Sequence, residues 1–145
     1  MNQIFSKVLE ELITQSEPAA RYFALENLFN LDPDDRELSL ARLALPKSPI
    51  IQSLCAFDLS LHPYQKWNGA HWRLVQLAEL GYPYINPGLE EPRAQVYAWL
   101  LSQQHLKSIR TLEGRTRRRA SQEANAVFAS VRLNLVDEQT EHLVT

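Results

Sequence analysis

Three carboxylates lie within four residues of one another, at Asp32, Asp34 and Asp35. Carboxylates that share a dry cavity can work in general-acid catalysis, because burial and mutual repulsion keep one of them protonated. The same residues also describe an acidic helix start, in which Asp32 caps the helix, Pro33 opens its first turn and the other carboxylates meet the positive end of the helix dipole. Their position directly before an amphipathic helix favours the helix start.

A group of potential metal ligands follows at Cys55, Asp58 and His62. Zinc binds cysteine, histidine and carboxylate side chains. The spacing of these three residues matches no zinc pattern, and the chain has a single cysteine. A buried free cysteine on a helix is the commoner arrangement. We therefore predict no metal site and no cofactor.

The aromatic residues gather in the middle of the chain and include all three tryptophans. The candidate ligand-binding residues are His62, Tyr64, Trp67, His71, Trp72, Arg73 and Trp99, and Tyr82, Tyr84 and Tyr97 belong to the same stretch. Aromatic faces that line a cavity attract cations. A helical repeat with an aromatic core has the same composition, with His71 and Arg73 satisfied by hydrogen bonds. The sequence leaves both interpretations open.

The basic residues cluster once, between residues 107 and 119, where the helical period breaks at Glu113-Gly114. This segment predicts a short β-hairpin. Its candidate anion-binding residues are Arg110, Arg115, Arg117 and Arg119. Alternation along a strand would place Arg115, Arg117 and Arg119 on one face, where they could bind phosphate or an acidic partner. The alternative is a solvated hairpin whose arginines pair with Glu90, Glu91 or Glu123.

Helices must position these residues, because apolar side chains recur at helical spacing along most of the chain. The expected helices cover residues 3–14, a stretch from Pro18 to near Asn30, 35–45, 50–57, 70–80, 90–104, a stretch that begins with Ser121 as its cap, and a short helix capped by Asp137. Residues 58–69 read as a structured loop. The predicted fold class is all-α with one β-hairpin.

One pattern at the end of a helix occurs three times, with Asn30, Gly81 and Asn134 in equivalent places. Asparagine and glycine tolerate the left-handed backbone that ends a helix, and an apolar residue follows each of them. The spacing between successive copies is close to fifty residues. A period of that length indicates an α/α helical-repeat array, here a single domain spanning residues 1–145.

Three stretches, residues 18–54, 66–87 and 117–138, resemble successive repeats of bacterial squalene cyclase-like or prenyltransferase-repeat proteins. The lead motif of this resemblance is Lys-Trp-Asn-Gly-Ala-His-Trp-Arg-Leu at 66–74. The resemblance implies helix pairs that wind into a toroid. A complete toroid needs more helices than this chain offers, so an open arc or superhelix is expected. Residues 32–35 also have the letters of the D-x-D-D acid motif of squalene–hopene-type cyclases, although that motif belongs to a later part of the cyclase fold.

The composition indicates a soluble and cytoplasmic protein. The chain has 145 residues, of which 45% are hydrophobic and 22% charged, and its formal net charge is −2. That charge argues against nucleic acid as a partner. The single cysteine suits a reducing compartment, and we expect neither a signal peptide nor a membrane span.

The combined features favour a non-catalytic helical-repeat binding or scaffold module with an unknown small-molecule or protein ligand. The alternative is a fragment of a cyclase-like or prenyltransferase-like enzyme that acts on an isoprenoid substrate. The last helices present Val127, Phe128, Val131 and Leu135 with little chain left to cover them. We therefore expect either a homodimer through the C-terminal helices or further repeats beyond Thr145.

Overall fold

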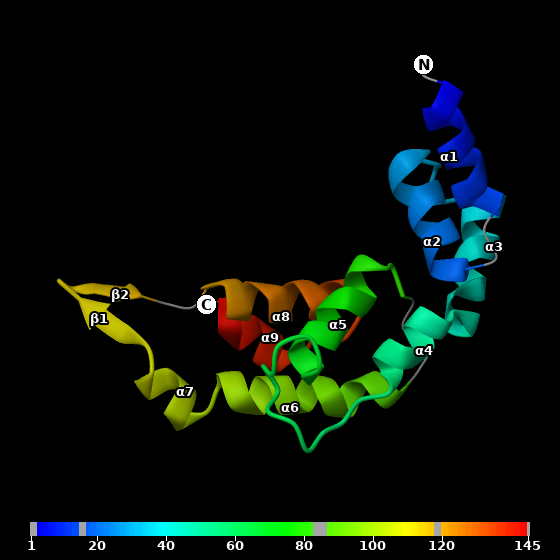
Figure 1. Cartoon of the computed structure of the whole chain (residues 1–145). Coiled ribbons are helices and arrows are strands. Elements are labelled where there is room, and N and C mark those ends of the chain that lie inside the picture. The colour runs from blue at the N-terminus through cyan, green and yellow to red at the C-terminus, as the bar shows by residue number, and fades with distance from the viewer. Residues whose placement is uncertain (1–2, 15–16, 83–86, 118–119, 145) are drawn as a thin grey trace.

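Helices form most of the structure, a computed structural model that describes residues 3–14, 17–82, 87–117 and 120–144 (Figure 1). The elements are α1 (Gln3–Thr14), α2 (Pro18–Phe23), the π-helix η1 (Ala24–Leu28), α3 (Arg36–Ala44), the 3-10 helix η2 (Leu45–Lys47), α4 (Pro49–Cys55), α5 (Ala70–Glu79), the 3-10 helix η3 (Pro87–Leu89), α6 (Glu90–Leu100), α7 (Gln103–Lys107), β1 (Arg110–Leu112), β2 (Arg115–Arg117), α8 (Ala120–Arg132) and α9 (Glu138–Val144). Strands β1 and β2 form an antiparallel hairpin. The predicted all-α fold with one hairpin is confirmed.

Three helix pairs follow one another along the chain, and the two helices of each pair pack against each other. A turn follows the first helix of each pair. The pairs are α2 with α3, α5 with α6, and α8 with α9. The turns contain Asn30, Gly81 and Asn134, whose φ angles are 50°, 66° and 55°. All three therefore adopt the left-handed conformation that the sequence predicts for them.

The hydrogen bonds at these turns explain why a left-handed residue is needed. After α5, the Tyr82 N–H donates to the carbonyl of Leu77 at 3.0 Å, and after α8 the Leu135 N–H donates to Ser130 at 2.8 Å. These hydrogen bonds are those of a Schellman motif, which ends both α5 and α8. The first turn is wider, because η1 precedes it and the Leu31 N–H reaches back six residues.

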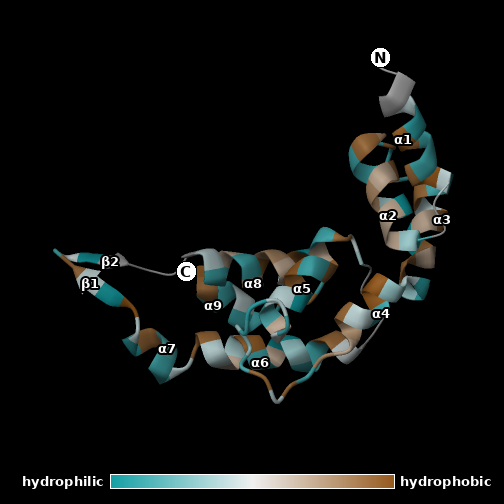
Figure 2. Cartoon of the chain, in the orientation of Figure 1, coloured by the Kyte–Doolittle hydropathy of each residue, from teal (hydrophilic) through white to brown (hydrophobic). Residues whose placement is uncertain are grey.

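The helix pairs lie along an open, bent arc (Figure 1). We call α1 to α3, with η1 and η2, the N-terminal arm, and α5, α6, α8 and α9 the C-terminal block. Helix α4 connects them by contacting both η2 and α5. Helix α5 is the centre of the block, since it packs on both α6 and α8 and buries Leu74 and Leu77. Hydrophilic and hydrophobic residues alternate around each helix, as amphipathic packing requires (Figure 2).

Three predicted helix boundaries are wrong. Asp35, and not Asp32, caps α3, because its carboxylate accepts the N–H groups of Glu37 and Leu38. The helix expected over 90–104 divides at Ser102, whose extended backbone and side-chain oxygen begin α7. Ser121 lies inside α8, which begins at Ala120. In the first two cases a side-chain oxygen of the capping residue accepts a backbone N–H and fixes the start of the helix. No helix within the described ranges is long and apolar enough to cross a bilayer.

Candidate functional site

Seven ring side chains from four segments meet in one continuous group, the aromatic cluster. Its members are His62, Tyr64 and Trp67 from the loop before α5, His71 and Trp72 from α5, Trp99 from α6 and His105 from α7. Neighbouring ring centroids lie 4.8 to 5.4 Å apart. The structure therefore brings together the six candidate residues that carry rings. His105 was missed, because the expected helix over 90–104 gave no sign of the break at Ser102 that starts α7 and brings His105 against Trp99.

The loop at residues 56–69 reaches the cluster because its backbone folds closely over the start of α5. The Gly69 N–H donates to the carbonyl of Gln65 at 2.8 Å, and the His71 N–H donates to the carbonyl of Pro63 at 3.0 Å. A Cβ at Gly69 would lie 2.4 Å from that Pro63 oxygen, so only glycine fits there. This close approach holds Tyr64 between Trp72 and Trp99.

Trp67 is the exposed end of the aromatic cluster. Its side chain is 59% exposed, and its φ angle is +67°. A bulky residue in the left-handed region is strained, and such strain is concentrated at functional positions. The Trp67 indole packs on Trp72, and the centroids of the two rings are 5.4 Å apart. The Lys66 ammonium lies 5.3 Å from the centroid of the Trp67 ring. The fold thus holds a large apolar side chain in water at a conformational cost.

Buried polar atoms lie beneath Trp67. His71 is 1% exposed, and its Nε2 lies 3.0 Å from the carbonyl of Gln122, which assigns the proton to Nε2. Burial lowers the pKa of His71, although the bond to Gln122 opposes this, so the ring is neutral at pH 7. His71 Nδ1 and Trp72 Nε1 are buried without a hydrogen-bond partner in the described residues.

Arg73, the seventh candidate, does not belong to the ligand-facing part of this cluster. Its guanidinium donates to the backbone carbonyls of Ser53, Leu54 and Asn68. It therefore holds the end of α4 against the loop, which agrees with the alternative of a hydrogen-bonded structural arginine. Its Nε and Nη1 donors are engaged, and its role is to position the loop that carries Trp67.

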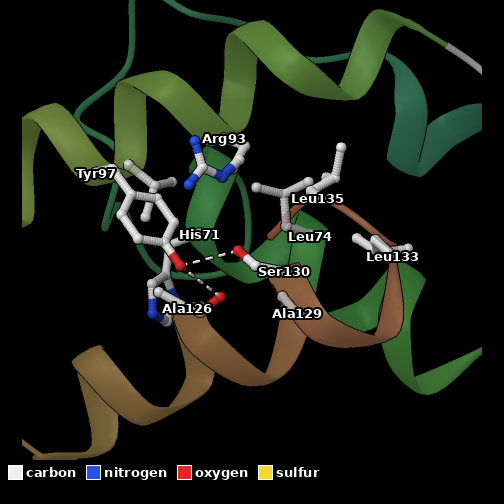
Figure 3. Close-up of a pocket in the computed structure, with 10 residues that line it drawn as sticks. His71, Leu74, Arg93, Tyr97, Ala126, Ala129, Ser130, Leu133 and Leu135 are labelled. Carbon is white, nitrogen blue, oxygen red and sulfur yellow. Dashed lines mark hydrogen bonds between the residues drawn. The ribbon is translucent and has the colours of Figure 1, made fainter. Parts of the chain in front are cut away.

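Tyr97 lies outside the aromatic cluster and lines a small core cavity between α5, α6 and α8 (Figure 3). Its hydroxyl lies 2.9 Å from Ser130 Oγ and 3.3 Å from the carbonyl of Ala126. The cavity volume is about 10 Å³, which is enough for one water molecule and too small for a substrate. Arg93 covers the ring of Tyr97 at 4.1 Å. This region is core packing in which the Tyr97 hydroxyl is hydrogen-bonded, while His71 Nδ1 and Arg93 Nε have no hydrogen-bond partner among the described residues.

The acidic residues at 32–35 form a helix start. The Asp32 carboxylate accepts the Asp34 N–H at 2.9 Å, and Asp35 caps α3. Asp32 and Asp34 are exposed and Asp35 is half-buried. These exposed and half-buried carboxylates therefore lack the dry cavity that general-acid chemistry needs.

The potential zinc ligands at 55–62 serve separate local roles. The Asp58 carboxylate accepts the N–H and the hydroxyl of Ser60, and those bonds lower its pKa. The His62 Nδ1 accepts the Tyr64 N–H, and Cys55 is a half-buried free thiol whose pKa is raised by burial. Among the described residues, no three histidine, cysteine or acidic side chains are arranged to hold a metal ion.

The hairpin projects away from the helices (Figure 1). In its register Arg110 pairs with Arg117, and Leu112 pairs with Arg115. Arg110 and Arg115 therefore share one face, where both are exposed and have no ion-pair partner in the described part of the chain. The side chain of Arg117 and the whole of Arg119 lie outside the described residues. Anion binding by these arginines stays a prediction.

Comparison with known proteins finds no matching family model, curated protein or solved structure.

Proposed function

We propose that this protein is a binding module whose ligand-contact surface is the exposed end of the aromatic cluster. The observation that carries the proposal is Trp67, which is 59% exposed while its backbone is held in the left-handed region. Tryptophan is enriched among the residues that dominate binding energy at interfaces, and Trp67 is supported from below by the Trp72 ring. The ligand we expect has a planar or apolar face to stack on the exposed Trp67 indole.

The binding function is favoured over the enzyme-fragment alternative by the local roles of the acidic residues. The Asp32 and Asp35 carboxylates are engaged in turns and caps, and the core cavity around Tyr97 has room for one water. The resemblance to squalene cyclase-like proteins and their toroid stays a prediction. A binding module of this kind would act in the cytoplasm, as the lone cysteine indicates.

Trp67→Gly should weaken ligand binding without unfolding the protein. Glycine removes the indole and also suits the left-handed backbone, so the free energy of unfolding should not fall. The measurement is selection from a displayed peptide library and binding to an immobilised glycan panel, each performed with both proteins. We expect ligands of the wild-type protein to lose at least about tenfold in affinity on the variant.

The matched control is Leu43→Ala, which removes another exposed apolar side chain on the distant N-terminal arm. Leu43→Ala should bind the same ligands as the wild type, with the same affinities. Ligands that bind Trp67→Gly as well as they bind the wild type would contradict the proposal, and so would a wild-type protein that selects nothing from either library.

We also propose self-association through the C-terminal helices. Val131, Val136 and Val144 are each more than half exposed near the end of the chain, while Leu135 is buried and Val127 and Phe128 are half-buried. Of the four residues expected on this apolar face, only Val131 is largely exposed, and Val136 and Val144 are exposed as well. Light scattering at micromolar concentration should give twice the monomer mass. Val131→Glu should restore the monomer, and a monomeric wild type would contradict the proposal.

A further inference from the structure

A second cavity lies where the N-terminal arm meets the C-terminal block, and we call it the junction cavity. Its volume is about 180 Å³. It is lined by Tyr22, Glu26, Arg42, Gly81, Tyr82 and Arg132. These residues come from α2, η1, α3, the turn after α5 and the last turn of α8, so the wall joins segments that are far apart in sequence.

The N-terminal side of this cavity is a closed network of hydrogen bonds. The Tyr22 hydroxyl donates to Glu26 at 2.6 Å and accepts from Arg42 at 2.8 Å. Arg42 also lies 3.8 Å from the Glu26 carboxylate and 5.5 Å from the centroid of the Tyr22 ring. The one carboxylate of the wall is thus already engaged by two donors. This arrangement leaves no free acidic group that could attract a cationic ligand.

The opposite side of the cavity carries an unmatched positive charge. Arg132 is exposed, and it forms no ion pair with any residue in the described ranges. With Arg42 balanced by Glu26, the wall has one surplus guanidinium. Guanidinium groups bind carboxylates and phosphates through two parallel charge-assisted hydrogen bonds.

We propose that the junction cavity binds a small oxyanion, a carboxylate or phosphate group that pairs with Arg132. The cavity is smaller than the roughly 300–1,000 Å³ that drug-sized ligands occupy, so the ligand is small. Its walls on α3 and α8 belong to the arm and the block, respectively. A bound anion that contacts Arg132 and the Arg42 side therefore links the two halves of the arc and stabilises the angle between them.

The test is a titration of the full chain with inorganic phosphate and, separately, with acetate. The backbone amide of Gly81, which lines the cavity, reports on binding by two-dimensional NMR, and only four glycine amides need to be assigned in this chain. The wild type should show saturable shifts of Gly81 with one or both anions. The anion that binds more tightly identifies the chemical group of the ligand.

Arg132→Gln should weaken that binding at least about tenfold, since a charge-assisted pair is lost. Arg36→Gln on α3 removes an exposed arginine outside the cavity and should bind as the wild type does. At one fixed anion concentration the thermal midpoint should rise equally in the wild type and in Arg36→Gln, and rise less in Arg132→Gln. Equal affinity of Arg132→Gln and the wild type, or the absence of saturation with both anions, would overturn the proposal.

Discussion

Gly81→Ala should lower the free energy of unfolding by about 3 kcal/mol, the sum of two separate costs. The φ angle of Gly81 is +66°, where any side chain strains the backbone. A Cβ at this position would also lie 2.3 Å from Tyr22 Cε1, and the Tyr22 ring is 1% exposed and held by Glu26 and Arg42. The ring cannot move aside without breaking its hydrogen bonds. Denaturant unfolding of both proteins measures the difference.

Gly114→Ala separates the two costs. Gly114 has a φ angle of +75°, and a Cβ built there would meet nothing within 4 Å. This variant should therefore lose only the backbone term of about 1 kcal/mol. Equal losses for the two variants would mean that the contact of Gly81 with Tyr22 does not hold the arm against the block.

Arg93→Met should destabilise the protein by about 3 kcal/mol, because the buried guanidinium holds α9 onto α6. The Arg93 side chain is 8% exposed and donates to Asp137, Gln139 and Thr140, at the start of α9. It also covers the ring of Tyr97. Methionine keeps the bulk and loses every one of these bonds. Hydrogen exchange should additionally show that the α9 amides lose protection before those of α5.

The pH dependence of the stability lost in Arg93→Met identifies the electrostatic part of that loss. Partial burial alone would raise the pKa of Asp137, but hydrogen bonds from Arg93, Thr140 and Gln139 outweigh it and lower that pKa below the ordinary value. Stability from a lowered carboxyl pKa is present above the unfolded value of about 3.9 and is lost as the pH falls through the folded value. The difference between Arg93→Met and the wild type should therefore shrink below about pH 4.

Arg132→Met is the matched control for Arg93→Met. It removes an exposed arginine of the same block and should change the free energy of unfolding by less than about 0.5 kcal/mol. A loss of that small size for Arg93→Met as well would contradict the role assigned to the buried guanidinium.

The sequence predicted the features that depend on neighbouring residues. The left-handed turns at Asn30, Gly81 and Asn134 follow from the residue types that tolerate that backbone. The hairpin follows from the break in the helical period at Glu113-Gly114. The contacts among most of the aromatic cluster follow from closeness along the chain and from the loop that Gly69 closes.

The features that depend on distant segments could not be predicted from the sequence. Arg93 and Asp137 are 44 residues apart, and the periodicity of α6 gives no sign that a charged residue is buried there. The junction cavity exists because the turn at Gly81 lies against Tyr22, a contact between two helix pairs. The left-handed backbone of Trp67 is likewise unexpected, since residue type alone disfavours it.

The most direct test of the binding surface is an NMR map of a selected ligand on the three tryptophan indoles. Each tryptophan gives one indole Nε1–H resonance, and the chain has three. Saturating ligand should shift the Trp67 and Trp72 resonances most, while the amide of Gly81 in the distant turn stays in place. A ligand that saturates the protein and leaves the Trp67 and Trp72 indoles unchanged would contradict the account.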